Sequence, residues 1–334
     1  MTWKLLGHEQ AIAYLKQHSH PEKTRHAYLI TGPEGVGKRT LALAFVKALN
    51  CTQPPSQGEF CGECTTCRQI DMQAFPDLTV LTPEPGKDLR IEQIRTMQQT
   101  LALAPYQSRY RIVMILNFHH ATASASNALL KSLEEPPSRA ILILTADAAE
   151  SLLPTIASRC EVLRLRPQPV DVAAEGLSKQ FGIASEMARR YAHLTSGRIG
   201  AALRLERDPQ SLNVYEEALD LLEELLPAKQ RERLNSLDGL MKSKSGPREA
   251  AATLVPAWLT WWRDCLMVNA GADVPLVNLN RQPQIAKVAG QVSGANLRGL
   301  LESHEAALGQ IESYVNARLL IENLVLSLPR VQVG

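Results

Sequence analysis

The sequence predicts an α/β domain built on a mainly parallel sheet, followed by two helical domains. Up to about residue 166, short runs rich in β-branched and other apolar residues alternate with helical patterns. Strands separated by helices in this way are typical of βαβ units, whose strands run parallel. The runs that we expect to form strands are residues 27–31, 78–81, 112–116, 141–145 and 161–165.

The domain boundaries follow from chain length and from breaks that contain proline. At 334 residues the chain exceeds one ordinary domain. The segment Pro167-Gln168-Pro169 interrupts both periodicities and predicts a hinge, and Asp208-Pro209 ends a short helical stretch. We therefore expect three domains, at residues 1–166, 167–208 and 209–334. In the last of them Trp258, Trp261 and Trp262 crowd one helix, where they form either core or a subunit interface.

The composition is that of a globular protein with real cores. Hydrophobic residues make up 45% of the chain and charged residues 21%. The net charge of +2 gives no support to a protein that binds DNA mainly through bulk positive charge. The amino-terminal residues become charged too early for a signal peptide, and no run approaches the ~18 apolar residues of a membrane helix. We expect a cytoplasmic location without membrane contact.

A phosphate-binding loop is predicted directly after the first strand. Residues 32–38 read GPEGVGK, which matches the G-x-x-x-x-G-K pattern between a strand and a helix. Gly32, Gly35 and Gly37 allow backbone N–H groups to turn toward phosphate oxygens, and Lys38 would reach the outer phosphates. The alternative is a glycine turn that binds nothing.

The residue that should hold magnesium is missing from this loop. A working loop places a Ser or Thr hydroxyl on Mg²⁺ directly after the Lys. Here Arg39 occupies that position and Thr40 comes one residue later. One residue on a helix is a rotation of about 100°, so Thr40 is not a simple substitute.

The end of the third strand lacks catalytic groups as well. An ATPase of this class needs an acidic residue for Mg²⁺ there and, in many families, a glutamate that activates water. The chain has Asn117, a weak neutral ligand, and Phe118, which accepts no proton. His119 and His120 follow, and on a strand end they would point in opposite directions, so we expect no metal site from them.

Four of the six cysteines are clustered: Cys51, Cys61, Cys64 and Cys67. In a reducing compartment such a cluster favours metal binding over disulfides. Four thiolates suit structural Zn²⁺, and the C-x₂-C-x₂-C spacing also suits an iron–sulfur cluster. A zinc ribbon that reads nucleic acid is a weaker alternative, because few cations or aromatic residues lie nearby.

The chain resembles the AAA+ clamp-loader family, and within it the delta-prime subunits of bacterial DNA polymerase III. The most specific segments are NALLKSLEEPP at 127–137 and PTIASRC at 154–160. The resemblance also covers residues 7–10, 25–38, 51–67, 75–77 and 91–95. It implies an α/β AAA+ domain with a zinc-binding insertion at 51–67, a helical lid domain and an all-α collar domain.

The resemblance also implies roles for single residues. Arg159 matches an arginine that projects into the neighbouring subunit's ATP site, where its charge accelerates hydrolysis. The alternative for Arg159 is a pair with a local carboxylate. Thr145 falls where the family keeps a polar γ-phosphate sensor, and Gly200 falls where it keeps a second sensor arginine, which this chain lacks.

Taken together, these features predict a subunit that does not hydrolyse ATP itself. The catalytic gamma/tau subunits of the family keep the acidic pair that Asn117 and Phe118 replace. The expected partners are gamma/tau and delta in a hetero-oligomeric ring, with the sliding clamp and primed DNA reached through the complex. Two alternatives are an ATP-hydrolysing subunit of the gamma/tau kind and a zinc-containing DNA-binding module. The sequence leaves open whether the loop still binds nucleotide.

Overall fold

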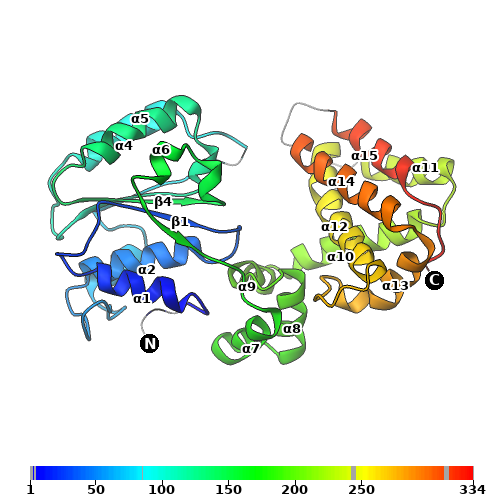
Figure 1. Cartoon of the computed structure of the whole chain (residues 1–334), viewed down its shortest axis with the longest axis horizontal. Coiled ribbons are helices and arrows are strands. Elements are labelled where there is room, and N and C mark those ends of the chain that lie inside the picture. Colours follow the sequence, from blue (N-terminus) through cyan, green and yellow to red (C-terminus); the bar gives the residue numbers. More distant parts are fainter. Residues whose placement is uncertain (1–2, 4, 85, 242–245, 312–315, 334) are drawn as a thin grey trace. The chain divides into compact units, whose positions relative to one another are not determined.

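The chain forms two compact units. The structure, a computed structural model, describes residues 3, 5–84, 86–241, 246–311 and 316–333 (Figure 1). The first unit takes in the chain up to Gln168 together with Arg198–Ala201, and the second takes in Pro169–Gly197 and the chain from Ala202 onward. The first unit therefore ends within two residues of the predicted hinge. The division of the helical remainder into two domains at residue 208 stays a prediction.

The first unit is built on a five-stranded sheet in the order β2-β3-β4-β1-β5, in which all neighbouring strands are parallel. The predicted strands are confirmed, with ends that differ by at most one residue. The strands are β1 (Ala27–Thr31), β2 (Leu78–Leu81), β3 (Arg111–Ile115), β4 (Ala140–Ala146) and β5 (Glu161–Arg164). The three central strands β1, β3 and β4 are buried along their whole length, as expected for a parallel sheet covered on both faces.

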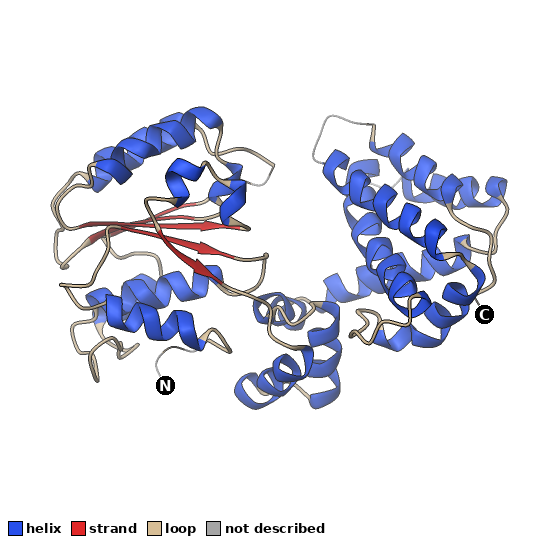
Figure 2. Cartoon of the chain, viewed as in Figure 1, coloured by secondary structure: helices blue, strands red, loops and turns tan. Residues whose placement is uncertain are grey.

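Helices cover the two faces of the sheet (Figures 1 and 2). Tyr28 and Ile30 of β1 pack on the side of α2, where they meet Phe45, whereas Leu29 packs with Leu129 of α5 on the other side. This alternation follows from the two-residue period of a strand. The helices of this unit are α1 (Glu9–His18), α2 (Lys38–Asn50), α3 (Thr65–Asp71), α4 (Ile91–Leu101), α5 (Ala123–Glu134) and α6 (Pro154–Ala157).

The second unit is helical throughout its described residues. Trp258, Trp261 and Trp262 of α12 are fully buried in its core, which agrees with the first of the two alternatives raised from the sequence and not with a subunit interface. Its helices are α7 (Val170–Phe181), α8 (Ser185–Leu194), α9 (Ile199–Arg207, which starts in the first unit), α10 (Pro209–Leu225), α11 (Gln230–Met241), α12 (Gly246–Asn269), α13 (Gln282–Gln291), α14 (Gly294–Ile311) and α15 (Ala317–Ser327).

Polar contacts join α8, on which α7 packs, to the longer helices that follow. Arg190 of α8 pairs with Glu216 of α10 at 2.5 Å, and Glu216 also pairs with the buried Arg281 at 2.6 Å. His193 of α8 lies 2.7 Å from the carbonyl oxygen of Leu276. These contacts explain why residues 169–197 group with the helices that follow them.

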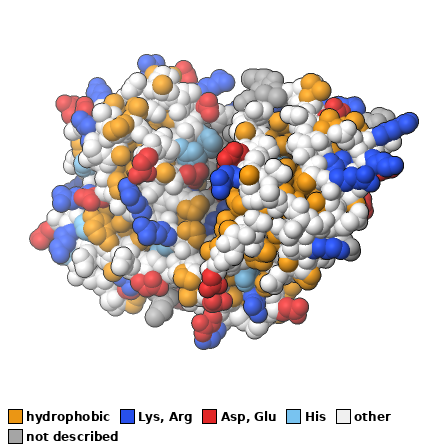
Figure 3. Space-filling model, turned by 45° about the vertical axis from the view of Figure 1, so that its right-hand side comes forward, with side chains coloured by type: hydrophobic (Ala, Val, Ile, Leu, Met, Phe, Trp, Pro, Cys, Tyr) orange, Lys and Arg blue, Asp and Glu red, His pale blue; other side chains and the backbone are white. Residues whose placement is uncertain are grey.

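None of the helices in the described ranges combines the length and the apolar character that a membrane span requires. On the face shown in Figure 3, Lys and Arg side chains are interspersed with Asp and Glu, in agreement with the small net charge of +2.

A buried histidine lies beside two of the core tryptophans. The His304 ring centroid is 6.2 Å from those of Trp258 and Trp262, and the side chain is fully buried. Nδ1 lies 2.7 Å from the Leu300 carbonyl oxygen, and Nε2 has no hydrogen-bond partner among the described residues. Burial lowers the pKa of His304, although the contact with Leu300 opposes this shift.

We expect the second unit to lose stability as the pH falls below about 6.5, the ordinary histidine pKa. Because burial lowers the pKa of His304 in the folded state, the unfolded chain binds more protons as the pH falls through this range, and the free energy of unfolding decreases. The slope for one proton is at most about 1.4 kcal/mol per pH unit. Urea unfolding followed by tryptophan fluorescence at pH 7.5 and 5.5 measures it.

The variant His304→Gln should show a smaller loss of stability between these two pH values than wild type. His20→Gln, in the other unit, serves as the matched control and should keep the wild-type loss. An unchanged pH dependence in His304→Gln would show that His304 is not its source.

Candidate functional site

The predicted phosphate loop has the backbone conformation that its glycines permit. It connects β1 to α2, and Gly32, Gly35 and Gly37 have φ values of 144°, 78° and 113°. L side chains rarely adopt these values. A Cβ at Gly32 would also lie 2.4 Å from the Leu165 carbonyl oxygen, so the close approach of β5 requires glycine here.

The lysine of the loop is buried and paired. Only 8% of the Lys38 side chain is exposed, and its amine donates hydrogen bonds to the Gly32 carbonyl oxygen and to Asp147 Oδ1, the latter at 2.9 Å. Asp147 directly follows β4 and is a site residue that the sequence analysis missed. Its only sequence signal is its place at the end of a strand, two residues after Thr145.

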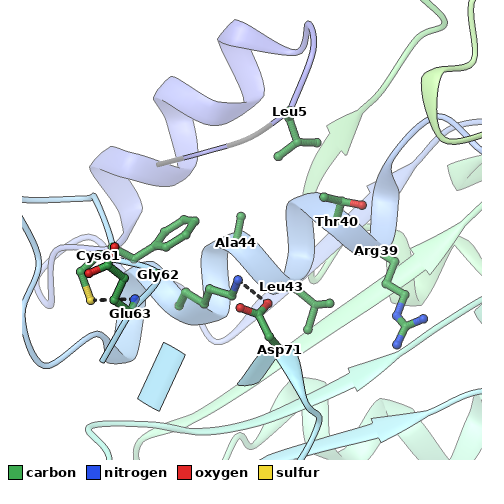
Figure 4. A pocket seen from close by; sticks show the side chains of 11 residues that line it. Leu5, Arg39, Thr40, Leu43, Ala44, Cys61, Gly62, Glu63 and Asp71 are labelled. Atoms are coloured by element: carbon green, nitrogen blue, oxygen red, sulfur yellow. Dashed lines mark hydrogen bonds and ion pairs between the residues drawn. The ribbon is translucent and has the colours of Figure 1, made fainter. Parts of the chain in front are cut away.

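Arg39 and Thr40 lie on the exposed side of α2. Both line a cavity of about 660 Å³ beside the cysteine insertion (Figure 4). Lys38 is not among the residues that line this cavity. Leu43, Ala44 and Phe60 contribute apolar surface to the same cavity. The contribution of Thr40 to nucleotide binding stays a prediction.

The end of β3 is built around a core phenylalanine. Phe118 is 1% exposed and packs in the cluster that contains Leu129 of α5 and Val113 of β3. Asn117 adopts a left-handed conformation with φ 51°, and its backbone N–H donates to Thr145 Oγ1 at 2.9 Å. The Thr145 hydroxyl therefore joins the ends of β3 and β4, and its role as a phosphate sensor stays a prediction.

The sequence analysis wrongly placed the two histidines on the end of a strand. His119 and His120 belong to a 3₁₀ turn, η1 (Phe118–His120), and not to a strand. On this tighter turn their rings lie 4.2 Å apart instead of pointing in opposite directions. Among the described residues, neither belongs to a group of three or more side chains placed to hold a metal.

Gly200, where the resemblance predicts the position of a second sensor arginine, packs against the phosphate loop. Ala201 donates its backbone N–H to the Gly35 carbonyl oxygen at 3.2 Å. A Cβ at Gly200 would lie 2.8 Å from that same oxygen. The segment thus has no room for a larger side chain without a shift of the loop.

Arg159 lies in the turn between α6 and β5. Its side chain is 36% exposed, and it pairs with Glu134 at the end of α5 at 2.9 Å. It also donates to the Thr155 carbonyl oxygen at 2.9 Å. The pair with a local carboxylate, the alternative raised from the sequence, is therefore present in the isolated chain.

The four clustered cysteines come together in space. Their sulfur atoms all lie within 4.8 Å of one another, and Cys51 Sγ is 3.6 Å from that of Cys61 and 3.9 Å from that of Cys64. Four thiolates around zinc at about 2.3 Å would lie roughly 3.8 Å apart. The cluster can therefore hold a metal ion.

Two of the four thiols carry hydrogen bonds that favour the thiolate form, whereas burial raises the pKa of Cys51 and Cys67. Desolvation raises the pKa of Cys64, but hydrogen bonds from Thr52 and from the Cys67 backbone bring it to about 6. Backbone N–H groups of Glu63 and Cys64 lower the pKa of Cys61. Metal binding requires deprotonated thiols, so these hydrogen bonds suit a metal site.

Known proteins resemble the chain over both units. A family model described as DNA polymerase III, delta subunit, matches residues 7–169. The delta' subunit of DNA polymerase III from Bacillus subtilis is 28% identical over 333 residues, which cover 98% of each chain. The gamma/tau subunit from Mycobacterium tuberculosis is 25% identical over 96% of this chain and 59% of its own length.

The chain is similar to the delta' and gamma/tau subunits of DNA polymerase III over almost its whole length. The delta' subunit of Pseudomonas aeruginosa is 39% identical over 40% of this chain and 41% of its own. The family model spans the phosphate loop, the cysteine cluster, Thr145 and Arg159. The predicted architecture, an α/β domain on a parallel sheet followed by a helical carboxyl-terminal part, is confirmed.

We expect Phe118→Glu to reduce stability strongly, because it puts a carboxylate into an apolar core. The loss of a buried aromatic ring alone costs about 3–5 kcal/mol, which corresponds to a fall of about 6 °C or more in Tm. Asn117→Asp, at the partly exposed neighbouring position, should change Tm by less than about 2 °C. Thermal unfolding of the two variants measures the difference. Equal and small shifts would mean that Phe118 does not support the core.

Proposed function

We propose that the chain is a delta-prime-type clamp-loader subunit that hydrolyses no ATP at its own site and supplies Arg159 to the ATP site of a neighbouring subunit. In this role it assembles with gamma/tau and delta subunits in a ring in the cytoplasm. Through the complex it helps to load the sliding clamp on primed DNA. The observation that carries the proposal is that the parallel sheet separates Arg159 from the chain's own phosphate loop.

This separation follows from strand direction. Arg159 precedes β5, at the amino ends of the strands, whereas the loop follows β1 at their carboxyl ends. Glu161 is paired with Tyr28, and Gly32 comes four residues after Tyr28. At about 3.3 Å per residue, roughly 13 Å of strand lies between the two levels. Arg159 therefore fits a role at a site on another chain.

The contacts of Arg159 in the isolated chain allow such a role. Its partner Glu134 is 51% exposed, and ion pairs of this kind contribute only about 0.2–1 kcal/mol. The guanidinium can leave Glu134 at little cost when a phosphate of higher charge comes within reach. A guanidinium beside the γ-phosphate offsets the charge that builds up on the transferring oxygens.

The chain's own site lacks the groups that hydrolysis requires. Arg39 replaces the hydroxyl ligand of Mg²⁺, Asn117 replaces the acidic ligand, and Phe118 is part of the core. The similarity to gamma/tau subunits favours an ATP-hydrolysing subunit as the second candidate. The side chains at the end of β3 argue against it.

We further propose that the cysteine cluster holds one structural Zn²⁺ through Cys51, Cys61, Cys64 and Cys67. When bound, the ion crosslinks the insertion and supplies no open coordination position for chemistry. Cys64 caps the first turn of α3, since its sulfur accepts a hydrogen bond from the Cys67 backbone N–H. The cluster thus connects the insertion to a helix that packs on α2.

Arg159→Ala should leave folding and ring assembly intact and lower the clamp- and DNA-stimulated ATPase of the assembled complex. At the one adjacent site the loss should reach about 10³–10⁵ in rate, so the total turnover falls only partially. The measurement compares rings of matched stoichiometry that contain wild type or variant.

Two controls accompany this experiment. Arg164→Ala removes another exposed, paired arginine at the other end of β5 and should leave the ATPase unchanged. The isolated wild-type chain should show no ATPase above background. Equal ATPase in rings with wild type and Arg159→Ala would reject the proposed role of Arg159.

The purified protein should carry about one Zn²⁺ per chain, measured by elemental mass spectrometry. Cys64→Ser should lose the metal and accelerate hydrogen exchange in residues 51–67, because the insertion loses its crosslink. Cys160→Ser, outside the cluster, should retain the metal. Iron with a visible chromophore, or no metal at all, would contradict the zinc assignment.

A further inference from the structure

Several polar groups of the phosphate loop already have hydrogen-bond partners elsewhere in the same chain. Lys38, its cation, donates to Asp147 Oδ1 at 2.9 Å and to the Gly32 carbonyl oxygen. The Gly35 carbonyl oxygen accepts from the Ala201 backbone N–H at 3.2 Å. These are contacts that an incoming polyphosphate would have to meet or displace.

Asp147 contacts the loop at two points. Its backbone carbonyl oxygen accepts a hydrogen bond from the Gly32 N–H at 3.0 Å, and its carboxylate pairs with Lys38. The second carboxylate oxygen lies 3.4 Å from His119 Nε2 in the turn after β3. Asp147 therefore connects the ends of β1, β3 and β4 around the loop.

The Asp147 carboxylate contacts Lys38 where a phosphate group would otherwise bind. In a loop that binds nucleotide, the lysine faces the outer phosphates. Here the Lys38 side chain is 8% exposed and already has a negatively charged partner. A nucleoside polyphosphate would have to displace Asp147 from Lys38 and would then lie beside a second negative charge, which repels it.

We propose that Asp147 is an internal anionic ligand of the phosphate loop and that it keeps nucleoside polyphosphates out of this site. Lys38 then has a structural role, in which it joins α2 to the end of β4. This role accounts for a loop that keeps its glycines and its lysine although Arg39 and Phe118 replace catalytic groups. The inference concerns the chain's own loop and is independent of the role of Arg159.

The test measures binding of a fluorescent ATP analogue to the full-length chain by fluorescence anisotropy. Other subunits and Mg²⁺ are omitted. Asp147→Asn should bind more tightly than wild type by up to about fivefold, the effect of removing one partly exposed ion pair. Glu150→Gln is the matched control, because it removes the same charge from an exposed residue of the same connection between β4 and α6. It should bind as wild type does.

The double variant Asp147→Asn/Lys38→Ala should lose the gain, since the freed lysine is its source. Equal affinity of wild type and folded Asp147→Asn would overturn the proposal. So would an equal gain in Glu150→Gln, which would trace the effect to net charge.

A second measurement does not depend on the folding of a variant. Acylation of lysines in the wild-type chain, followed by mass spectrometry, reports whether inorganic triphosphate reaches Lys38. We expect no protection of Lys38 by triphosphate at micromolar concentration. Protection at that concentration would show that the site is open and would overturn the proposal.

Discussion

The burial of both faces of the parallel sheet is the constraint on which the first unit depends. Because β1, β3 and β4 are buried throughout and apolar except near their ends, their polar groups lie at the strand ends. Parallel strands place all carboxyl ends at one edge and all amino ends at the other. The phosphate loop, Thr145 and Asp147 lie at the first edge, and Arg159 lies at the second. The sheet therefore places the phosphate loop at one edge and Arg159 at the opposite edge, out of reach of that loop.

Polar groups at the carboxyl edge of the sheet hold separate segments of this chain together. Thr145 accepts from the Asn117 backbone, Asp147 accepts from Lys38, and Ala201 donates to Gly35. Each contact joins segments far apart in sequence, between strand ends or between the loop and the start of α9. Groups that bind nucleotide in an active relative can thus be retained because the fold needs them.

Local patterns were sufficient to predict the strands, the glycine loop and the four cysteines. The strands are continuous apolar runs, and the cysteines lie within seventeen residues of each other. The pairing of Lys38 with Asp147 spans 109 residues, and that of Arg159 with Glu134 joins a helix to a distant turn, so no local pattern reveals either. The histidine turn was missed because the strand was extended past its end. The grouping of α7 and α8 with the later helices depends on tertiary contacts such as that of Arg190 with Glu216.

The burial of Phe118 has an evolutionary consequence. A catalytic base exchanged for another polar residue at a solvated position can return by one substitution, since nothing else has adapted to its absence. Phe118 instead fills space between the sheet and α5, and its neighbours pack against an aromatic ring. A carboxylate at this position would therefore require compensating changes among the apolar residues that pack around Phe118. Under the proposed function, the packing around Phe118 therefore acts against the return of a catalytic base and preserves the reliance on ATP sites in other subunits.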